Sequence, residues 1–277
     1  MPRVCILTDS SAQFTSTNFP GHDLVYVIPF EKQDPPRQEQ APLPRSASAP
    51  GLGVPTAHEY LKFYTELGRQ YDSILTLVLS SMLGSGVRHA LAASQQYSSH
   101  AAIRVVDTQS VAIGLGLLVE QAARALSQGV SLDDTVHMIR AALPRLYMLI
   151  CVPELTYLSR AGHLDPAQAL AGEVLGMLPV FAVEEGRLSP IQKVRTMRHL
   201  FETFEEFMAE FETPARIALL RGTGQESIRT RPLRQFVQEA FPYTRYSEHA
   251  MSATVEGLFG AKSIALVIQD SPQERPG

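Results

Sequence analysis

The chain has 277 residues and carries 24 Lys and Arg against 28 Asp and Glu, a formal charge of −4. A nucleic-acid binder usually needs a basic face for its phosphate contacts, so this balance argues against that class of protein. Hydrophobic residues make up 45% and charged residues 19% of the chain, which is typical of a globular protein and too apolar for a disordered one. This length predicts one or two domains.

Cys5 and Cys151 each stand alone in an apolar run, a pattern that favours buried free thiols. The apolar stretch before Asp9 is too short for a signal peptide. The longest apolar runs fall well below the roughly 18 residues that a membrane span requires. We therefore expect a cytoplasmic protein with no integral membrane segment.

The first half predicts a parallel-sheet α/β domain over residues 1–147. Three short apolar runs are predicted to be buried strands, each ending in a hydroxyl-rich turn, and runs of this kind suit a parallel sheet covered on both faces. Apolar residues at helical spacing follow the second and third runs, which completes a strand–turn–helix repeat. The predicted strands are residues 4–7, 74–79 and 103–106, and the predicted helices are residues 87–94 and 115–126.

Residues 32–56 hold six of the 19 prolines. Proline fixes φ and removes a backbone donor, so we expect an irregular loop here, neither helix nor central strand. A long loop of this kind is either a lid or binding loop or a disordered insert. The sequence leaves both open.

The second half, residues 148–277, is predicted to be a second α/β (α+β) domain. Apolar runs predict strands, the spacing of apolar residues predicts helices, and residues 184–188 are typical of a hairpin turn. The predicted strands are residues 146–152, 177–182, 216–220 and 263–268, and the predicted helices are residues 199–211 and 227–240.

The usual catalytic signatures are absent from the sequence. It has no Gly-Lys-Ser/Thr phosphate loop, no His-Glu-x-x-His and no Cys-x-x-Cys, and its eight histidines lie at no metal-ligand spacing. Gly222-Thr223-Gly224 lacks the third glycine of a dinucleotide-binding motif, because Ser227 stands at that position. We therefore expect no metal and no cofactor.

Three hydroxyl-rich turns remain as a candidate site. They follow predicted parallel strands, at the sheet edge where open α/β sheets bind ligands, and each opens a helix whose free N–H groups favour an anion. The richest turn runs from Ser80 to Gly86 and contains two glycines that let the backbone approach a ligand. Ser, Thr and Asp are also the preferred helix caps, so plain capping is the alternative.

Short motifs follow one another in a characteristic order along the chain. In the first half they are Thr8-Asp9-Ser10-Ser11, Ile28-Pro29-Phe30, Pro55-Thr56, Ser80-Ser81-Met82-Leu83 and Val105-Val106-Asp107-Thr108. In the second half they are Leu155-Thr156-Tyr157-Leu158-Ser159-Arg160-Ala161-Gly162, Leu178-Pro179-Val180, Gly186-Arg187-Leu188 and Lys193-Val194-Arg195-Thr196. With these motifs the chain resembles the DegV family of fatty-acid-binding proteins over nearly its whole length.

The resemblance implies a two-domain α/β carrier, not an enzyme. Such a protein holds one long-chain fatty acid between its domains and presents it to a separate kinase that phosphorylates the carboxylate. In the family the carboxylate is held by a Thr-Ser pair, by the serine of a Leu-Ser-Gly-Thr turn and by a histidine near the C-terminus. This sequence departs from the family at those positions and at a Gly-Gly-Arg motif, where it reads Leu52-Gly53, Leu83-Gly84-Ser85-Gly86, Glu256 and Ala161-Gly162-His163.

These departures predict an altered head-group site. Ser81, Ser85 and the backbone N–H groups around Gly84 remain to bind the lipid head, with Gly53 and Ser10 beside them. Arg160, His163 and Arg195 are instead candidates for contacts with a partner or an anion.

Glu256 raises a separate question at this site. A glutamate close to the lipid carboxylate would force one of the two acids to keep its proton. Either Glu256 points elsewhere, or the ligand is not a simple anion.

We favour a carrier whose fatty acid tail lies in an apolar tunnel between the domains. Burying about 14 methylenes at roughly 0.8 kcal/mol each gives about 11 kcal/mol before binding costs. Losing one or two neutral hydrogen bonds costs only about 1–3 kcal/mol. One alternative is a phosphotransferase or hydrolase that uses Asp9, Asp107 and Ser10 at the sheet edge. The other is a protein that binds a protein partner and no lipid.

Overall fold

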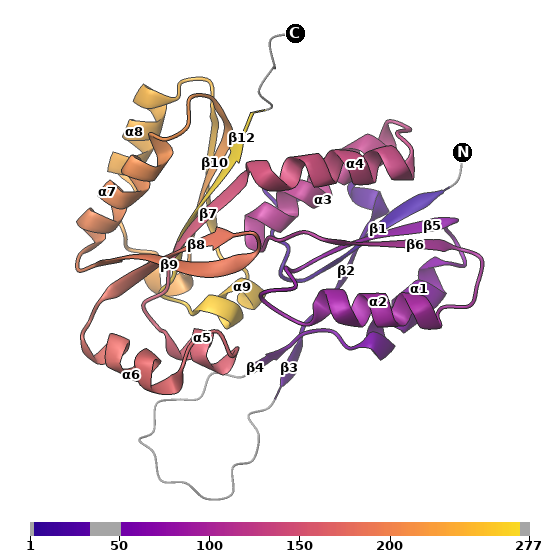
Figure 1. The fold of residues 1–277 in the computed structure, drawn as a ribbon. Helices are drawn as coiled ribbons and strands as arrows, with labels where there is room; N and C mark the ends of the chain where they lie inside the picture. Colours follow the sequence, from indigo (N-terminus) through magenta and orange to yellow (C-terminus); the bar gives the residue numbers. More distant parts are fainter. Residues whose placement is uncertain (1–2, 34–50, 272–277) are drawn as a thin grey trace, which may run out of the picture.

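Two β-sheets form the framework of the fold (Figure 1). The computed structural model describes residues 3–33 and 51–271. The first half forms a four-stranded sheet and the second half a six-stranded sheet. Across the first sheet the strands are β2 (Val25–Ile28), β1 (Val4–Asp9), β5 (Ser73–Val78) and β6 (Ala102–Asp107). Across the second they are β11 (Arg245–Ala250), β10 (Pro214–Arg221), β12 (Ile264–Asp270), β7 (Leu146–Cys151), β8 (Leu178–Glu184) and β9 (Arg187–Val194).

All neighbouring strands of the first sheet run parallel. This confirms the three predicted strands, which are β1, β5 and β6, and the α/β class of the first half. The prediction missed β2, an edge strand in which only Ile28 is fully buried. Its four residues, Val25-Tyr26-Val27-Ile28, do form a short apolar run, so the sequence carries a signal for this strand that the prediction did not use.

The second sheet is mixed, because only β10 and β11 pair parallel while the other neighbours pair antiparallel. The predicted strands of this half correspond to β7, β8, β10 and β12. The hairpin turn joins β8 to β9 through Glu185 and Gly186, both at positive φ. The prediction missed β9 and β11, which are the two edges of the sheet and carry polar residues.

Helices cover both faces of the first sheet and one face of the second. The first sheet lies between one helix pair and another, and α7 and α8 cover the far side of the second sheet (Figure 1). Short 3-10 turns within the described ranges are residues 22–24, 143–145 and 223–225. The helices are α1 (Ala57–Leu67), α2 (Gly86–Gln96), α3 (Ala112–Ser127), α4 (Leu132–Ala142), α5 (Thr156–Arg160), α6 (Pro166–Val174), α7 (Met197–Met208), α8 (Arg231–Ala240) and α9 (Ala253–Phe259).

The ends of the predicted loop 32–56 are ordered. The short strands β3 (Glu31–Gln33) and β4 (Gly51–Gly53) pair antiparallel, so an irregular loop is the wrong prediction at these ends. Their pairing is made by the backbone and leaves no apolar pattern in the sequence. Thr56 then caps α1, with its hydroxyl accepting from the N–H of Glu59 at 3.3 Å. The remainder of the predicted loop, residues 34–50, lies outside the described residues.

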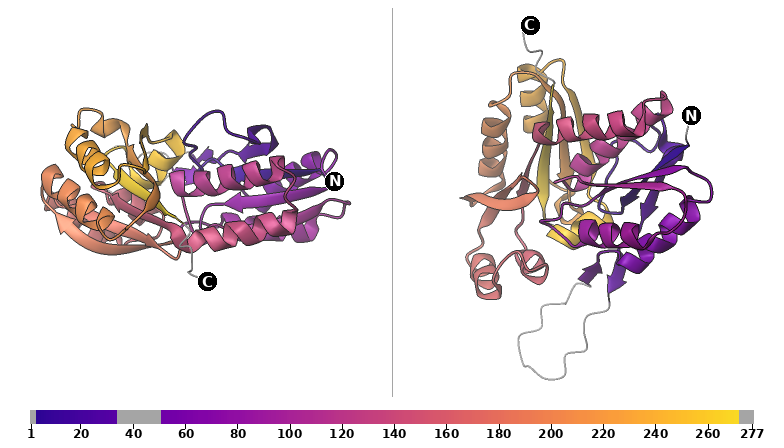
Figure 2. Two further views of the ribbon diagram at one scale, coloured as in Figure 1. Left: turned by 90° about the horizontal axis from the view of Figure 1, so that it is seen from above. Right: turned by 45° about the vertical axis from the view of Figure 1, so that its right-hand side comes forward.

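Helix α3 is packed between the two halves, which lie side by side in the views of Figure 2. Twelve of its 16 residues are buried. Leu118 and Val119 contact the core of the first half, whereas Ile113 and Leu117 belong to a cluster that also takes residues from the second sheet. A helix that is apolar on most sides is expected in such a position. We propose that the two sheets mark two domains with the predicted division at residue 147, beside the start of β7 at Leu146.

Both thiols are free and buried. Burial raises the pKa of Cys5 and of Cys151 to about 12. No helix in the described part of the chain combines the length and apolarity needed to cross a bilayer.

Leu118→Ala is expected to lower the free energy of unfolding by about 2–5 kcal/mol, because the fully buried side chain leaves a cavity under α3. Leu91→Ala on α2 is the matched control, since Leu91 is 45% exposed and its loss is expected to change stability by no more than about 0.5 kcal/mol. Urea denaturation of both variants measures this. Equal effects would contradict the central position of α3.

Candidate functional site

The turn after β1 is held together by a buried carboxyl group. Asp9 is fully buried; its Oδ1 accepts from the N–H of Ser11 at 2.9 Å and its Oδ2 accepts from the N–H of Leu79 at 2.8 Å. Burial raises the pKa of Asp9, against the opposing effect of these hydrogen bonds. Asp9 therefore ties the end of β1 to the end of β5, and both of its oxygens are engaged.

Asp107 performs the same task at the end of β6. Its Oδ1 accepts from the N–H groups of Gln109 at 3.0 Å and Ser81 at 3.2 Å, and its Oδ2 accepts from the Ser81 hydroxyl at 2.5 Å. The Ser81 side chain is therefore used within the turn. For Ser81 the capping alternative describes the structure better than the predicted head-group role.

Several hydroxyl and amide groups of this edge reach into the second half. The hydroxyl of Ser80 donates to the carbonyl of Gly186 at 2.8 Å. Ser10 Oγ accepts from the N–H of Phe30 at 2.8 Å and from the hydroxyl of Thr254 at 3.1 Å. Gln13 donates to the carbonyl of Ala250 and accepts from the N–H of Ser252. Contacts between the halves by Ser80, Gln13 and Thr254 could not be predicted from the sequence, because single polar residues give no pattern.

A hollow of about 400 Å³ opens beside the Ser80–Gly86 turn. It brings together the predicted residues Ser81, Gly84, Ser85 and His163. The His163 side chain is exposed. Partial desolvation lowers its pKa, and a hydrogen bond with the backbone of Leu83 opposes that shift. Within residues 3–33 and 51–271 the Ser85 hydroxyl has no hydrogen-bond partner, and it does not cap α2. The lining residues are Ser81, Met82, Leu83, Gly84, Ser85, Arg88, Ala161, Gly162 and His163.

The other predicted site residues lie outside this hollow. Gly53 is in β4, where it pairs with Glu31. Glu256 is in α9, and its carboxylate accepts from the N–H of Thr223 at 2.6 Å. Of the two alternatives stated above for Glu256, the structure therefore favours a side chain directed toward another loop.

The two predicted arginines are likewise outside the lining of the hollow. The Arg160 guanidinium lies over the Tyr157 ring, 4.6 Å from its centre. Arg195 is exposed just after β9. Neither position conflicts with a contact to a partner.

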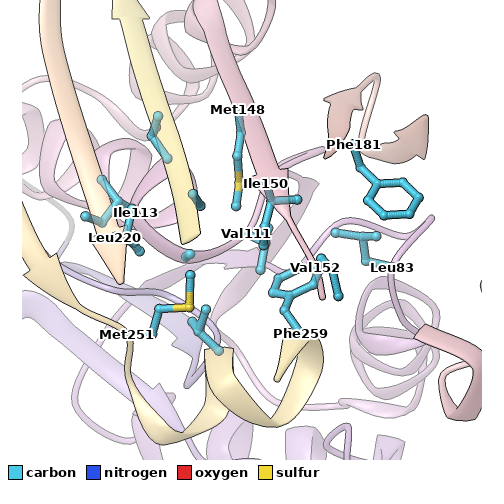
Figure 3. Packing of buried hydrophobic residues seen from close by; sticks show 14 of the residues in the cluster. Leu83, Val111, Ile113, Met148, Ile150, Val152, Phe181, Leu220, Met251 and Phe259 are labelled. Atoms are coloured by element: carbon cyan, nitrogen blue, oxygen red, sulfur yellow. The ribbon is translucent and has the colours of Figure 1, made fainter. Parts of the chain in front are cut away.

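A buried apolar cluster lies between the halves, next to the hollow, and we call it the shared cluster (Figure 3). Leu83 belongs both to this cluster and to the lining of the hollow. In Figure 3, Met148 and Ile150 from β7, Phe259 from α9 and Leu83 gather in one region. The first half contributes Phe30, Leu79, Leu83, Val111, Ala112, Ile113 and Leu117. The second half contributes Met148, Ile150, Val152, Leu155, Leu158, Ala169, Phe181, Ala218, Leu220, Met251, Val255, Phe259, Ala265 and Val267.

Comparison with known proteins places this architecture in a family. A family model described as "Uncharacterised protein, DegV family" matches residues 36–271, which is most of the chain. The chain belongs to the DegV family. The resemblance predicted from the motifs is thus confirmed. A DegV domain-containing protein of Streptococcus pyogenes serotype M3 is 30% identical over 222 residues, covering 75% of this chain and 77% of that protein.

Solved DegV structures share the fold. A DegV family protein from Thermus thermophilus, whose structure is described as fatty acid binding, has a TM-score of 0.79 and 23% identity over 97% of this chain and all of that chain. The Fatty Acid Kinase (Fak) B3 protein of Streptococcus pneumoniae, loaded with linoleic acid, has a TM-score of 0.80 and 17% identity over 97% of this chain and all of that chain. These likenesses confirm the two-sheet α/β fold of the DegV protein described here.

Ser81→Ala is expected to lower the free energy of unfolding by about 1 kcal/mol, because Asp107 loses a hydroxyl donor. Ser85→Ala removes a hydroxyl that has no hydrogen-bond partner among the described residues, so no loss of stability is expected. Chemical denaturation of the two variants checks the difference. A larger loss in Ser85→Ala than in Ser81→Ala would show that the roles are reversed.

Proposed function

We propose that this DegV protein binds one long-chain fatty acid in an apolar tunnel between its domains and presents it to a fatty acid kinase. The shared cluster carries the proposal. This cluster takes buried residues from both halves of the chain, and it reaches the hydroxyl-rich sheet edge through Leu83. The fatty acid binding described for the Thermus thermophilus relative supports the same ligand class here.

The tail is expected to lie among the side chains of the shared cluster. These side chains pack against one another in the structure, so a tail has to separate them as it enters. Contacts between side chains are then replaced by contacts between side chains and the methylenes of the tail, so the region stays apolar. The transfer of each methylene from water contributes about 0.8 kcal/mol of favourable free energy. A flexible residue such as Met148 or Met251 adapts readily to such an exchange.

The head group is expected at the sheet edge, where the tail region meets the hollow. Ser85 offers a hydroxyl without a partner there, and Gly84 exposes backbone close to the hollow. The first turn of α2 adds unpaired N–H groups. The Glu256 carboxylate accepts from the N–H of Thr223, so we propose no head-group contact for it.

Presentation to a kinase is supported by the openness of the edge and by a relative. Ser81 and Met82 at the mouth of the hollow are exposed, so a partner has access to a lipid head held there. The Streptococcus pneumoniae relative is described as a Fatty Acid Kinase B3 protein loaded with linoleic acid. Arg160, Arg195 and the rim residue Arg88 are the cations that we assign to the partner's side of this edge.

The catalytic alternative finds less support. Asp9 is fully buried with both oxygens accepting hydrogen bonds, and Asp107 is bound by Ser81 and Gln109. A general base needs a free lone pair within reach of the substrate. We therefore assign both aspartates to the turns of the sheet edge. The remaining alternative, a protein that binds only another protein, is separated from lipid binding by experiment.

Solvent extraction of the purified, denatured protein followed by mass spectrometry is expected to yield one long-chain fatty acid per chain. Lipid-free protein should then take up a fatty acid of 16 to 18 carbons and unfold at a higher temperature, because a ligand that binds only the native state stabilises it. A different lipid in the extract would reassign the ligand. No uptake and no stabilisation would favour the protein-binding alternative.

Mixing the loaded protein with a fatty acid kinase and ATP is expected to give acyl phosphate and ADP, as the lipid carboxylate attacks the γ-phosphorus and ADP leaves. Hydroxylamine trapping measures the acyl phosphate. Lipid-free protein with the same kinase is the control. Equal ADP release with and without lipid would exclude the presenting role while leaving lipid binding intact.

A further inference from the structure

A buried tyrosine hydroxyl lies close to the sheet edge without a partner. Tyr60 in α1 is fully buried, and among the described residues its hydroxyl makes no hydrogen bond. Tyr64, one turn further along the same helix, is equally buried, but its hydroxyl bonds with Thr76 at 3.1 Å and with the carbonyl of Ala90 at 3.4 Å. A buried donor left unpaired is costly, so the difference between the two tyrosines needs an explanation.

The Tyr60 hydroxyl faces a gap beside Gly86. A Cβ atom placed on Gly86 would lie 3.4 Å from Tyr60 Oη, 3.5 Å from Val54 Cγ1 and 3.9 Å from Asp9 Oδ2. These are ordinary contact distances, so the absence of a side chain on Gly86 leaves room for one more heavy atom among three neighbours. The O···O distance of such a hydrogen bond is about 2.5–3.0 Å, so an oxygen that lies about half an ångström closer to Tyr60 Oη than this point can accept from the hydroxyl.

Asp9 does not serve as the missing partner. Its Oδ1 accepts from Ser11 and its Oδ2 accepts from Leu79, and no hydrogen bond joins it to Tyr60 in the described residues. Burial, together with the charge of nearby Asp9, raises the pKa of Tyr60. The phenol therefore keeps its proton, and its O–H group is a hydrogen-bond donor without an acceptor among the described residues.

The gap adjoins the proposed lipid site. Val54 fills the space between Gly86 and Gly84: its second methyl would lie 3.3 Å from a Cβ on Gly84, and Val54 packs against the shared cluster. Gly84 itself lines the hollow. One side chain thus separates the Tyr60 hydroxyl from the region assigned to the lipid.

We propose that Tyr60 donates a hydrogen bond to the head-group oxygen of the bound lipid, in the gap beside Gly86. This inference rests on the proposed lipid-binding function and adds a specificity residue to it. The Asp9 carboxyl lies 3.9 Å from the same point, and like charges at close range force one group to keep its proton. Either the lipid carboxyl group or Asp9, whose pKa is raised by burial, is therefore expected to be protonated, and a head-group oxygen accepts from Tyr60 in either case.

Tyr60→Phe removes only the hydroxyl, and Tyr64→Phe is the matched control on the same helix. Palmitic acid binding to lipid-free full-length protein is the probe. Tyr60→Phe is expected to raise the dissociation constant about 5- to 15-fold, in line with one lost hydrogen bond, without lowering the unfolding midpoint. Tyr64→Phe is expected to lower the unfolding midpoint, because Thr76 loses its partner, with the dissociation constant changed less than about 2-fold.

Gly86→Ala gives a second test, because its methyl group would occupy the gap itself. We expect this variant to fold and to bind palmitic acid more weakly, by a factor comparable to that of Tyr60→Phe. Unchanged affinity in Tyr60→Phe or in Gly86→Ala would overturn the inference and leave the hydroxyl to a buried water or to no partner. Wild-type protein that takes up no fatty acid would instead overturn the proposed function, and the inference with it.

Discussion

The apolar contact between the two halves is the interaction on which the rest of the structure depends. Helices α7 and α8 cover only one face of the second sheet, and its other face is completed by residues such as Ile113 and Leu117 of α3 in the shared cluster. Without this contact the second sheet would expose an apolar face to water. A lipid tail between the domains would use the same surface, so stability and the proposed function draw on one set of side chains.

Polar bonds around the shared cluster fix how the halves meet. Glu120 in α3 is buried, accepts from the N–H of Thr15 at 2.7 Å and lies 3.6 Å from the Arg216 guanidinium of β10. Burial lowers the pKa of Arg216, whereas the charge of Glu120 opposes that shift. Ser80 and Gln13 add direct bonds across the boundary. The buried bond of Ser80 is costly to break, so space for a tail is expected from the apolar side chains that these bonds surround.

The sequence predicts the buried framework well and the edges poorly. Continuous apolar runs identify β1 and β5, which are buried along most or all of their length, whereas β9 and β11 are edge strands that carry polar residues. The edge strand β2 is apolar but has only four residues. The site shows the same division. The turns could be located from the sequence, and the hollow does join Ser81, Gly84, Ser85 and His163. That Ser81 is bound to Asp107 and Glu256 to Thr223 depends on three-dimensional pairings that no local pattern encodes.

Whether a polar group already has a partner separates structural from functional roles at this sheet edge. Asp9, Asp107 and Ser81 hold the turns together, and their side chains are occupied. Ser85 and Tyr60 carry hydroxyls without partners in the described residues. In the sequence Tyr60 is one more aromatic residue on the apolar face of a helix. Only the structure shows that its hydroxyl lacks a partner among the described residues whereas that of Tyr64 has one. A buried hydroxyl without a hydrogen bond is destabilising. A ligand oxygen that accepts from the Tyr60 hydroxyl is therefore expected to stabilise the complex relative to the lipid-free protein.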